Sequence, residues 1–353
     1  MSIRRFAHHP PTDATPLFEA FRWRYGSCLL TAALSHLGVF EKLAPSPLPD
    51  AALKQHLGLE DRPFQVLITG LLAMGLIQRS ASDLLELSEL AREHLLASAP
   101  YYMGDYLGLA AEAPEVLDLV ARLKTNRPAD IDAQGHAFIY RDGIASAMDS
   151  SQWARHFTLS LAGRARNVAP FLAEAMHLKG VHHLVDVAGG TGIYAMALLE
   201  RNPNLEITLV DLPEVLKVAA ECISGHPDAQ RLHLEEGDMF QWEPKRPFQA
   251  ALFSNVLHDW DQHECLRLIE RYAAMLPSPG KLFIHDVLLD DSLEGPLPIA
   301  LYSIALFTLT EGRAYSPAEY EQWLQRAGLR AGKPVSTAIH CAVIEATQSS
   351  SGG

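Results

Sequence analysis

The most constraining feature of the chain is a group of glycines between an apolar run and an amphipathic segment. The apolar run Leu184–Val187 stops at the glycine-rich segment Gly189–Gly192. A second apolar run ends roughly 20 residues later at Asp211, which is the layout of a nucleotide-binding βαβ unit. The glycines allow a tight turn and a close approach of the backbone to a ligand. We therefore expect an α/β fold with a Rossmann-like sheet and a ligand that contains a ribose.

The carboxylates of this unit indicate which ligand it binds. Asp211, at the end of the second strand, can accept hydrogen bonds from ribose hydroxyls. Gly189, Gly190 and Gly192 are spaced more tightly than in the dinucleotide fingerprint, so a pyrophosphate site is the weaker interpretation. A buried Asp186 suits a cationic group, such as the amino group of a methionine moiety. The alternative is that the glycines only make a strand-to-helix turn.

Two further motifs follow apolar runs in the same half of the chain. Asp238, Met239 and Phe240 offer one carboxylate beside two apolar side chains, a combination that suits the edge and face of an adenine. The segment Ser254–Asp261 brings an imidazole, carboxylates and an indole to the end of the run Ala250–Phe253. Parallel sheets bind their ligands at the carboxyl ends of their strands, so both motifs are expected at one site.

In this order, the motifs resemble those of class I S-adenosylmethionine-dependent small-molecule O-methyltransferases of plants and bacteria. The resemblance runs from about residue 18 to about residue 346, and its most specific segments are Asp186–Gly192, Val210–Pro213, Gly237–Phe240 and Leu257–Trp260. It implies a Rossmann-like methyltransferase sheet with helices on both faces, plus an N-terminal, mainly helical winged-helix dimerisation domain. It also implies S-adenosyl-L-methionine as cofactor, S-adenosyl-L-homocysteine as product, and methylation of a hydroxyl of an aromatic or otherwise apolar small molecule in secondary metabolism.

The resemblance also implies roles for individual residues. His258 would be the general base and Asp286 would orient it, while Glu311 is the candidate to replace a glutamate that plant members carry where this chain has Ala314. Plant members often carry a lysine where this chain has Ser254, which should weaken one polar contact. The implied cofactor-binding residues are Asp186, Gly189, Gly190, Gly192, Asp211, Leu212, Asp238, Met239, Phe240, Ser254 and Trp260.

The acceptor is expected to contact two helical segments. Gln152–Met176 has the pattern of a long amphipathic helix, and Pro298–Leu309 resembles the substrate lid of the family. The candidate substrate-binding residues are Trp153, Phe157, Tyr302 and Phe307. These aromatic side chains favour an apolar acceptor.

The first part of the chain predicts the outline of a winged helix. Two helical patterns, at 50–57 and 62–74, precede a hairpin pattern at 76–87. Phe21–Phe40 is apolar on all sides, which predicts a buried helix and, preferably, a homodimer interface. The predicted domains are a dimerisation domain (1–105), connecting helices that contribute to the substrate pocket (106–165) and an S-adenosylmethionine-binding catalytic domain (166–347).

The charge of the chain argues against two classes of partner. The net charge of -13 repels nucleic acid phosphates and anionic membrane surfaces. A winged-helix DNA-binding regulator is an alternative of another class, but Glu60 and Asp61 precede Arg62 in the second helix, so a cationic reading face is missing.

The sequence also bears on cellular location and on metal content. No apolar stretch approaches the roughly 18 residues that cross a bilayer, and the amino terminus lacks a secretory pattern. The four widely separated cysteines indicate a reducing cytoplasm. No histidine spacing predicts a metal site.

The chemistry of the reaction leaves alternatives open. The segment Glu311–Ser316 resembles a bacterial branch with methyltransferases that act on carbon as well as oxygen, so C- or N-methylation is one alternative. A hydroxylase or pericyclase that uses the bound sulfonium without transferring its methyl group is another. The sequence does not predict the acceptor, the methylated atom or the pathway.

Overall fold

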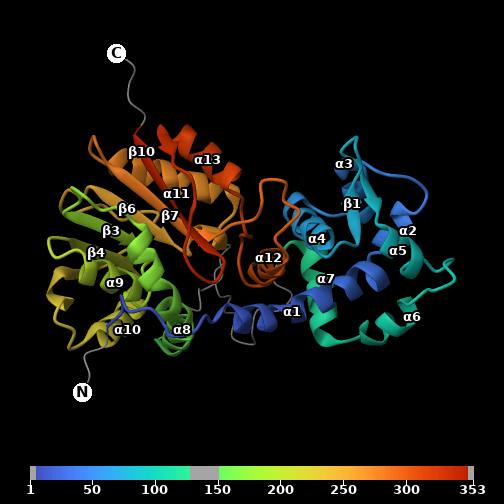
Figure 1. The fold of residues 1–353 in the computed structure, drawn as a ribbon, viewed down its shortest axis with the longest axis horizontal. Helices are drawn as coiled ribbons and strands as arrows, with labels where there is room; N and C mark the ends of the chain where they lie inside the picture. Colours follow the sequence, from blue (N-terminus) through green and yellow to red (C-terminus); the bar gives the residue numbers. More distant parts are fainter. Residues whose placement is uncertain (1–4, 128–150, 349–353) are drawn as a thin grey trace, which may run out of the picture. The chain divides into compact units, whose positions relative to one another are not determined.

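The computed structural model describes residues 5–127 and 151–348, which form two compact units (Figure 1). We call them the sheet unit and the helical unit, and each is described by itself. The sheet unit comprises residues 1–18, 138–288 and 315–353, and the helical unit comprises residues 19–137 and 289–314.

The sheet unit is built on an eight-stranded, mainly parallel sheet. The strand order is β5-β4-β3-β6-β7-β10-β8, with β9 paired to β10. The strands from β5 to β7 are parallel, and β10 runs antiparallel to β7, β8 and β9. The strands are β3 (His183–Val187), β4 (Glu206–Asp211), β5 (Leu232–Glu236), β6 (Ala250–Ser254), β7 (Lys281–Val287), β8 (Leu329–Ala331), β9 (Val335–Ser336) and β10 (Cys341–Gln348).

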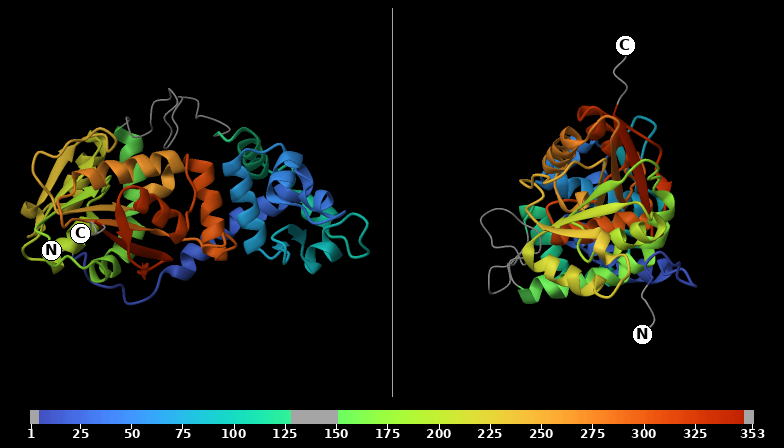
Figure 2. Two further views of the ribbon diagram at one scale, coloured as in Figure 1. Left: turned by 90° about the horizontal axis from the view of Figure 1, so that it is seen from above. Right: turned by 90° about the vertical axis from the view of Figure 1, so that its left-hand side faces the viewer.

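Helices cover both faces of this sheet because successive strand residues point to opposite sides. Leu184 packs in a core with α8, α9 and α10, whereas Val185 packs in a second core with α11 and α13. The right-hand view of Figure 2 shows α11 and the α8–α10 group on opposite sides of the sheet. The helices are α8 (Ser151–Ala175), α9 (Ile193–Arg201), α10 (Pro213–Ile223), η4 (Ala229–Arg231), η5 (Leu257–Asp259), α11 (Gln262–Met275) and α13 (Pro317–Arg326).

The topology of the sheet places its ligand site. The chain progresses outward from β3 to β4 and β5 on one side, and from β6 to β7 on the other. The carboxyl ends of β3 and β6 therefore flank the topological switch point, where α/β sheets bind ligands. The predicted Rossmann-like sheet with helices on both faces is confirmed.

The helical unit contains the expected winged-helix elements. The helices α3 and α4 are followed by an antiparallel hairpin in which Ile77 pairs with Leu87. Its elements are α1 (Thr15–Thr31), which leads into the unit, η1 (Ala32–His36), α2 (Val39–Leu43), α3 (Asp50–Leu57), α4 (Asp61–Ala73), β1 (Ile77–Arg79), β2 (Leu85–Leu87), α5 (Glu89–His94), α6 (Gly104–Leu107), η2 (Gly108–Ala110), α7 (Pro114–Thr125) and α12 (Leu297–Leu309).

The apolar segment Phe21–Phe40 is not one helix, so its predicted extent is wrong. The helix α1 ends at Thr31 and continues only as the π-helical turn η1. Gly38, with φ of 61°, then precedes α2. A left-handed residue cannot continue an α-helix, and glycine adopts this conformation without the strain that a side chain would cause.

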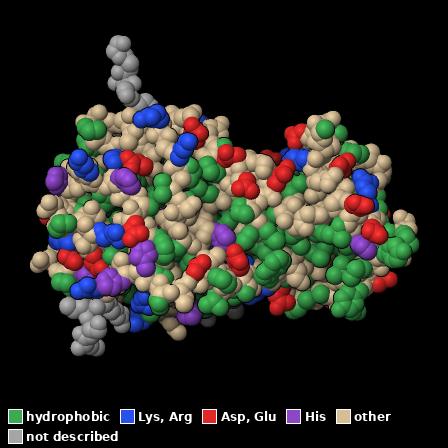
Figure 3. Space-filling model, viewed as in Figure 1, with side chains coloured by type: hydrophobic (Ala, Val, Ile, Leu, Met, Phe, Trp, Pro, Cys, Tyr) green, Lys and Arg blue, Asp and Glu red, His purple; other side chains and the backbone are tan. Residues whose placement is uncertain are grey.

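Part of the predicted burial in this segment is also absent within a single chain. Phe21 is 65% exposed and Trp23 is 55% exposed. Figure 3 shows apolar side chains gathered on the face of the helical unit that carries α1, α6 and α7. The exposed large apolar residues of this unit are Phe21, Trp23, Leu90, Tyr101, Met103, Tyr106, Leu109 and Leu117. The homodimer that would cover them stays a prediction.

The late helix α12 belongs to the core of the helical unit. It packs against α4, and Ile304 and Phe307 are buried. Its sequence is apolar on all sides, and such a helix must lie inside a core. The predicted domain boundaries placed this segment in the catalytic domain, whereas the compact units group it with the first part of the chain.

Arg62 secures the end of α12 from the neighbouring helix α4. Its guanidinium donates to the carbonyls of Phe307 at 3.2 Å, Gly312 at 3.0 Å and Thr310. The cation that a DNA-binding helix would use is therefore engaged inside the unit. Within the described ranges, no helix combines the length and apolar character that a membrane crossing requires.

Candidate active site

The turn after β3 brings the backbone to the carboxyl edge of the sheet. Ala188 has φ of 52°, an unusual value for a residue with a side chain, and Gly192 with φ of 71° precedes α9. A Cβ atom on Gly189 would lie 2.6 Å from the Oδ2 atom of Asp186 and from the Cγ atom of Leu209. Only glycine fits at position 189 without displacing its neighbours.

A cavity of about 400 Å³ lies in the sheet unit where β3, β4, β5 and β6 end. This volume is in the range of small-molecule sites. Most predicted cofactor residues line it, together with Phe157 of α8: Gly189, Gly190, Asp211, Leu212, Asp238, Met239, Phe240, Ser254 and Trp260. The other two, Asp186 and Gly192, are not among its lining residues.

Asp211 is held at the cavity by the backbone. Its Oδ2 atom accepts from the Gly190 N–H at 2.9 Å, and its Oδ1 atom accepts from the Leu212 N–H at 2.8 Å. Burial raises the pKa of Asp211 to about 6, and these two hydrogen bonds oppose the rise. Because a carboxylate has about four acceptor positions, Asp211 keeps capacity for further hydrogen bonds.

Asp186 lies beneath the turn rather than at the cavity wall. It is fully buried against Gly189, and neither carboxylate oxygen has a hydrogen-bond partner among the described residues. Burial, with a smaller contribution from the charge of Asp211, raises the pKa of Asp186 to about 8. The carboxyl group is therefore largely protonated at neutral pH. Its predicted contact with a ligand amino group stays a prediction.

The segment that follows β5 contributes one carboxylate, Asp238, and one aromatic ring, Phe240, to the cavity. The carboxylate of Asp238 accepts from the Phe240 N–H at 3.0 Å and from the Gln241 side chain at 3.1 Å. The rings of Phe240 and Trp260 lie 5.0 Å apart at an angle of 81°. This arrangement suits a flat heterocycle that carries hydrogen-bond donors.

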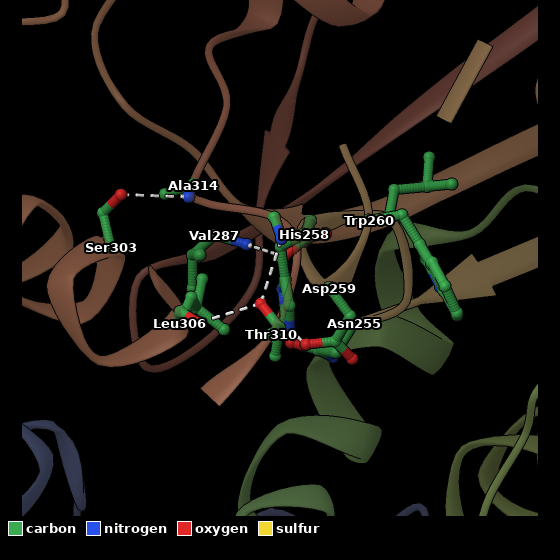
Figure 4. A network of polar contacts seen from close by, with 12 residues as sticks. Asn255, His258, Asp259, Trp260, Val287, Ser303, Leu306, Thr310 and Ala314 are labelled. Atoms are coloured by element: carbon green, nitrogen blue, oxygen red, sulfur yellow. Dashed lines mark hydrogen bonds and ion pairs between the residues drawn. The ribbon is translucent and has the colours of Figure 1, made fainter. Parts of the chain in front are cut away.

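His258 follows β6 within the short helix η5 (Figure 4). Its side chain is buried, with 3% of the residue exposed. Its Nδ1 atom is hydrogen-bonded to Oδ1 of Asp286 on β7, and its Nε2 atom lies 3.6 Å from Oδ1 of Asp259. Asp286 also accepts from the Val287 N–H at 2.8 Å and from the Tyr320 hydroxyl at 3.2 Å. The predicted pair of His258 and Asp286 is therefore present, and Tyr320 is a partner that the sequence did not reveal.

Electrostatics defines which nitrogen of His258 carries the proton in the neutral imidazole. Burial lowers the pKa of His258, but the charges of Asp286 and Asp259 outweigh it, and the net effect is a raised pKa. Burial also raises the pKa of Asp286, and His258 more than offsets this, so the net effect is a lowered pKa. An ionised Asp286 keeps the proton on Nδ1, which leaves Nε2 of the neutral imidazole as the acceptor.

A second polar group at the cavity was not predicted as a site. Arg164 of α8 donates to Oδ1 of Asn255 at 2.5 Å and to Sγ of Cys341 at 2.9 Å. Asn255 also donates to the Tyr194 hydroxyl at 3.4 Å. These residues come from four separate elements, so no local motif reveals them. The available signal is an arginine within the apolar pattern of α8.

Three of the predicted substrate residues are not among the residues that line this cavity. Trp153 is 37% exposed and is not among the lining residues. Tyr302 lies in the helical unit under the guanidinium of Arg22, at 4.1 Å from the ring centre. Phe307 is 4% exposed and packs in the core of that unit, which leaves little of its surface for a substrate. Their roles in binding an acceptor stay predictions.

Glu311 follows α12 in the helical unit and is half-buried. The neighbouring Ala314 donates its backbone N–H to Oγ of Ser303 at 3.1 Å, and Thr310 donates its hydroxyl to the carbonyl of Leu306 at 2.8 Å (Figure 4). The predicted action of Glu311 on His258 stays a prediction. In the part of the chain that the structure describes, no group of three or more His, Cys, Asp or Glu side chains could hold a metal ion.

Comparison with known proteins shows similarity to O-methyltransferases. A family model described as an O-methyltransferase domain matches residues 131–330. The 3-hydroxy-5-methyl-1-naphthoate 3-O-methyltransferase of Streptomyces sahachiroi is 32% identical over 85% of this chain and 84% of its own length.

Solved structures extend this similarity to the whole fold. An O-methyltransferase family 2 protein from Planctomyces limnophilus, crystallised with apigenin, is 43% identical with a TM-score of 0.89, over 99% of this chain and 100% of its own. Human N-acetylserotonin methyltransferase in complex with S-adenosylmethionine has a TM-score of 0.61 at 24% identity, over 97% of this chain and 100% of its own. The second similarity concerns the fold alone.

Proposed function

Because the chain belongs to the O-methyltransferase family, which depends on S-adenosylmethionine, we propose that its cavity binds this cofactor and that the enzyme methylates an aromatic hydroxyl group. The observation that carries the proposal is the position of Asp211, a carboxylate with acceptor capacity beside a turn at which only glycine fits.

The residues of the cavity fit the parts of this cofactor. Asp211 would accept from the ribose hydroxyls, and the backbone at Gly189 would lie along the methionine moiety. Asp238 would accept from the adenine amino group, and the aromatic pair of Phe240 and Trp260 would cover its ring. The bound cofactor supplies an electrophilic methyl group on a sulfonium sulfur.

The protein must align the acceptor and remove its proton. Alignment of the reacting atoms contributes much of the rate. Nε2 of His258 would take the proton of the acceptor hydroxyl, and the Asp286 carboxylate would stabilise the resulting imidazolium through Nδ1–H. General-base assistance of this kind typically contributes about 10²–10⁴-fold.

The nature of the acceptor is inferred from two relatives. The name of the Streptomyces enzyme specifies a hydroxynaphthoate, and the Planctomyces structure contains apigenin. Both compounds are phenols that contain a fused bicyclic ring system. We therefore assign a polycyclic phenol as the acceptor class of this enzyme.

The direct test is transfer of label from methyl-labelled S-adenosylmethionine to apigenin and to hydroxynaphthoates. Label in a methyl ether is expected. Label on a ring carbon would show that the enzyme is a C-methyltransferase. Conversion of the acceptor without label would indicate a hydroxylase or a pericyclase. Protein that binds S-adenosylhomocysteine but labels none of these phenols would overturn the acceptor class.

The role of His258 is tested separately. His258→Ala should lower turnover by about 10²–10⁴-fold and leave the affinity for S-adenosylhomocysteine nearly unchanged. His263→Ala is the matched control, because His263 is exposed on α11. A loss of less than about tenfold would remove His258 from the role of general base.

A further inference from the structure

The cavity carries an uneven set of charges. Asp211, Asp238 and Asp259 line it, whereas Arg164 is the single lysine or arginine among its described lining residues. S-adenosylmethionine has two cationic groups, the sulfonium and the ammonium, and one anionic group, the α-carboxylate. The carboxylates of the cavity suit the two cations, and Arg164 has the sign of charge that suits the carboxylate.

Arg164 is positioned by its neighbours before any ligand binds. Asn255 and Cys341 accept from its two terminal nitrogens, at 2.5 and 2.9 Å. Asn255 adopts φ of 56°, and its amide nitrogen donates to Oγ of Ser254 at 3.3 Å. A guanidinium held in this way loses little further freedom when it binds a carboxylate, and its planar fork matches that group.

Among the residues that the structure describes, the other polar groups beside Arg164 do not supply a second positive charge. Oγ of Ser254 lies 2.8 Å from Nδ1 of His285, whose Nε2 atom lies 3.1 Å from the Thr337 hydroxyl. Burial, followed by the charge of Arg164, lowers the pKa of His285 to about 3, so this imidazole is neutral. Ser254 and Tyr194 therefore present hydroxyl groups, and the positive charge at this wall comes from α8.

We propose that Arg164 binds the α-carboxylate of the methionine part of S-adenosylmethionine, with the hydroxyls of Ser254 and Tyr194 beside it. This inference rests on the proposed function, because it requires that cofactor in the cavity.

The test measures binding by calorimetry and needs no turnover. S-adenosylhomocysteine and its decarboxylated analogue, which keeps the amino group, are titrated into the native protein and into Arg164→Met. The native protein should bind S-adenosylhomocysteine about 10- to 150-fold more tightly than the analogue, the fold-change typical of a hydrogen bond to a charged group. Arg164→Met should lose most of this difference while it binds the analogue nearly as the native protein does.

Arg166→Met is the matched control. Arg166 is exposed on the same helix and does not line the cavity, so this variant should keep the native preference for S-adenosylhomocysteine. Arg164→Lys keeps the charge but not the planar fork, and an intermediate preference is expected.

The outcomes separate this inference from the proposed function. If the native protein binds neither compound, the assignment of the cofactor fails. If it binds both compounds equally, or if Arg164→Met weakens both equally, the cofactor assignment stands and the role of Arg164 is overturned. The comparison of two ligands on the native protein decides the question even if Arg164→Met does not fold.

Discussion

Replacement of Asp286 by asparagine tests how His258 is prepared for proton removal. The substitution keeps the size of the side chain but removes the charge that faces Nδ1. Asp286 raises the pKa of His258 against the opposing effect of burial, so its loss must lower that pKa. An asparagine can also offer either its oxygen or its amino group to Nδ1, so the tautomer is no longer fixed.

The expected magnitude follows from the lost hydrogen bond. A hydrogen bond to a charged group contributes about 1.5–3 kcal/mol. At about 1.4 kcal/mol per factor of ten, kcat/KM should fall about 10- to 150-fold. The stabilisation of the imidazolium in the transition state is the interaction that is lost, so KM for the acceptor should change little.

The assay is the pH dependence of kcat/KM for methyl transfer. In the native enzyme, activity should rise with pH through a pKa above the ordinary value of 6.5, because only the neutral imidazole accepts a proton. In Asp286→Asn the same rise should occur at lower pH, with a lower plateau. Tyr320→Phe removes a donor to Asp286 at 3.2 Å but keeps the carboxylate charge that faces Nδ1, so kcat/KM should fall less than in Asp286→Asn.

Two results would refute this reasoning. One is an Asp286→Asn enzyme whose activity rises at the same pH as in the native enzyme, since the titrating group would then not be His258 under the influence of Asp286. The other is a larger loss of kcat/KM in Tyr320→Phe than in Asp286→Asn, since the Tyr320 hydroxyl would then contribute more than the charge of Asp286.

Three other predictions concern the cofactor turn and the assembly. Asp211→Ala should weaken binding of S-adenosylhomocysteine by about 1–3 kcal/mol in a calorimetric titration, and an unchanged affinity would contradict the ribose assignment. Gly189→Ala should lower both that affinity and the melting temperature, because its Cβ atom would meet Asp186 and Leu209; a variant with native values for both would show that the turn relaxes freely. Light scattering should give about twice the chain mass of 38.8 kDa, and a fully active monomer would exclude the homodimer that we expect to bury Phe21.

The sequence predicted the sheet and most of the cavity because these depend on local motifs. Gly189 and Asp211 each follow an apolar strand, and topology alone brings the ends of parallel strands to one edge. The pair of His258 and Asp286 was expected from the resemblance to the methyltransferase family, and it forms because β6 and β7 are neighbours in the sheet.

The features that were missed depend on packing between distant segments. Arg164 meets Asn255 and Cys341 only after α8 packs against the sheet, and no spacing in the sequence records that contact. The break in the apolar segment at Gly38 is marked by a single residue, which the overall pattern obscured. The apolar pattern of α12 predicts that Phe307 is buried, but it does not reveal that α4 is the helix against which α12 packs.

The hydrogen bonds from Arg62 to the end of α12 join two segments that lie far apart in the sequence. The helical unit is discontinuous in sequence, since the segment that closes its core is synthesised only after most of the sheet unit. During synthesis, α4 therefore cannot pack against α12 until translation is nearly finished. A fragment that begins at α8 would carry an apolar helix without the side chains that cover it, so the two units are not interchangeable modules that evolution or an experimenter could separate by a single cut.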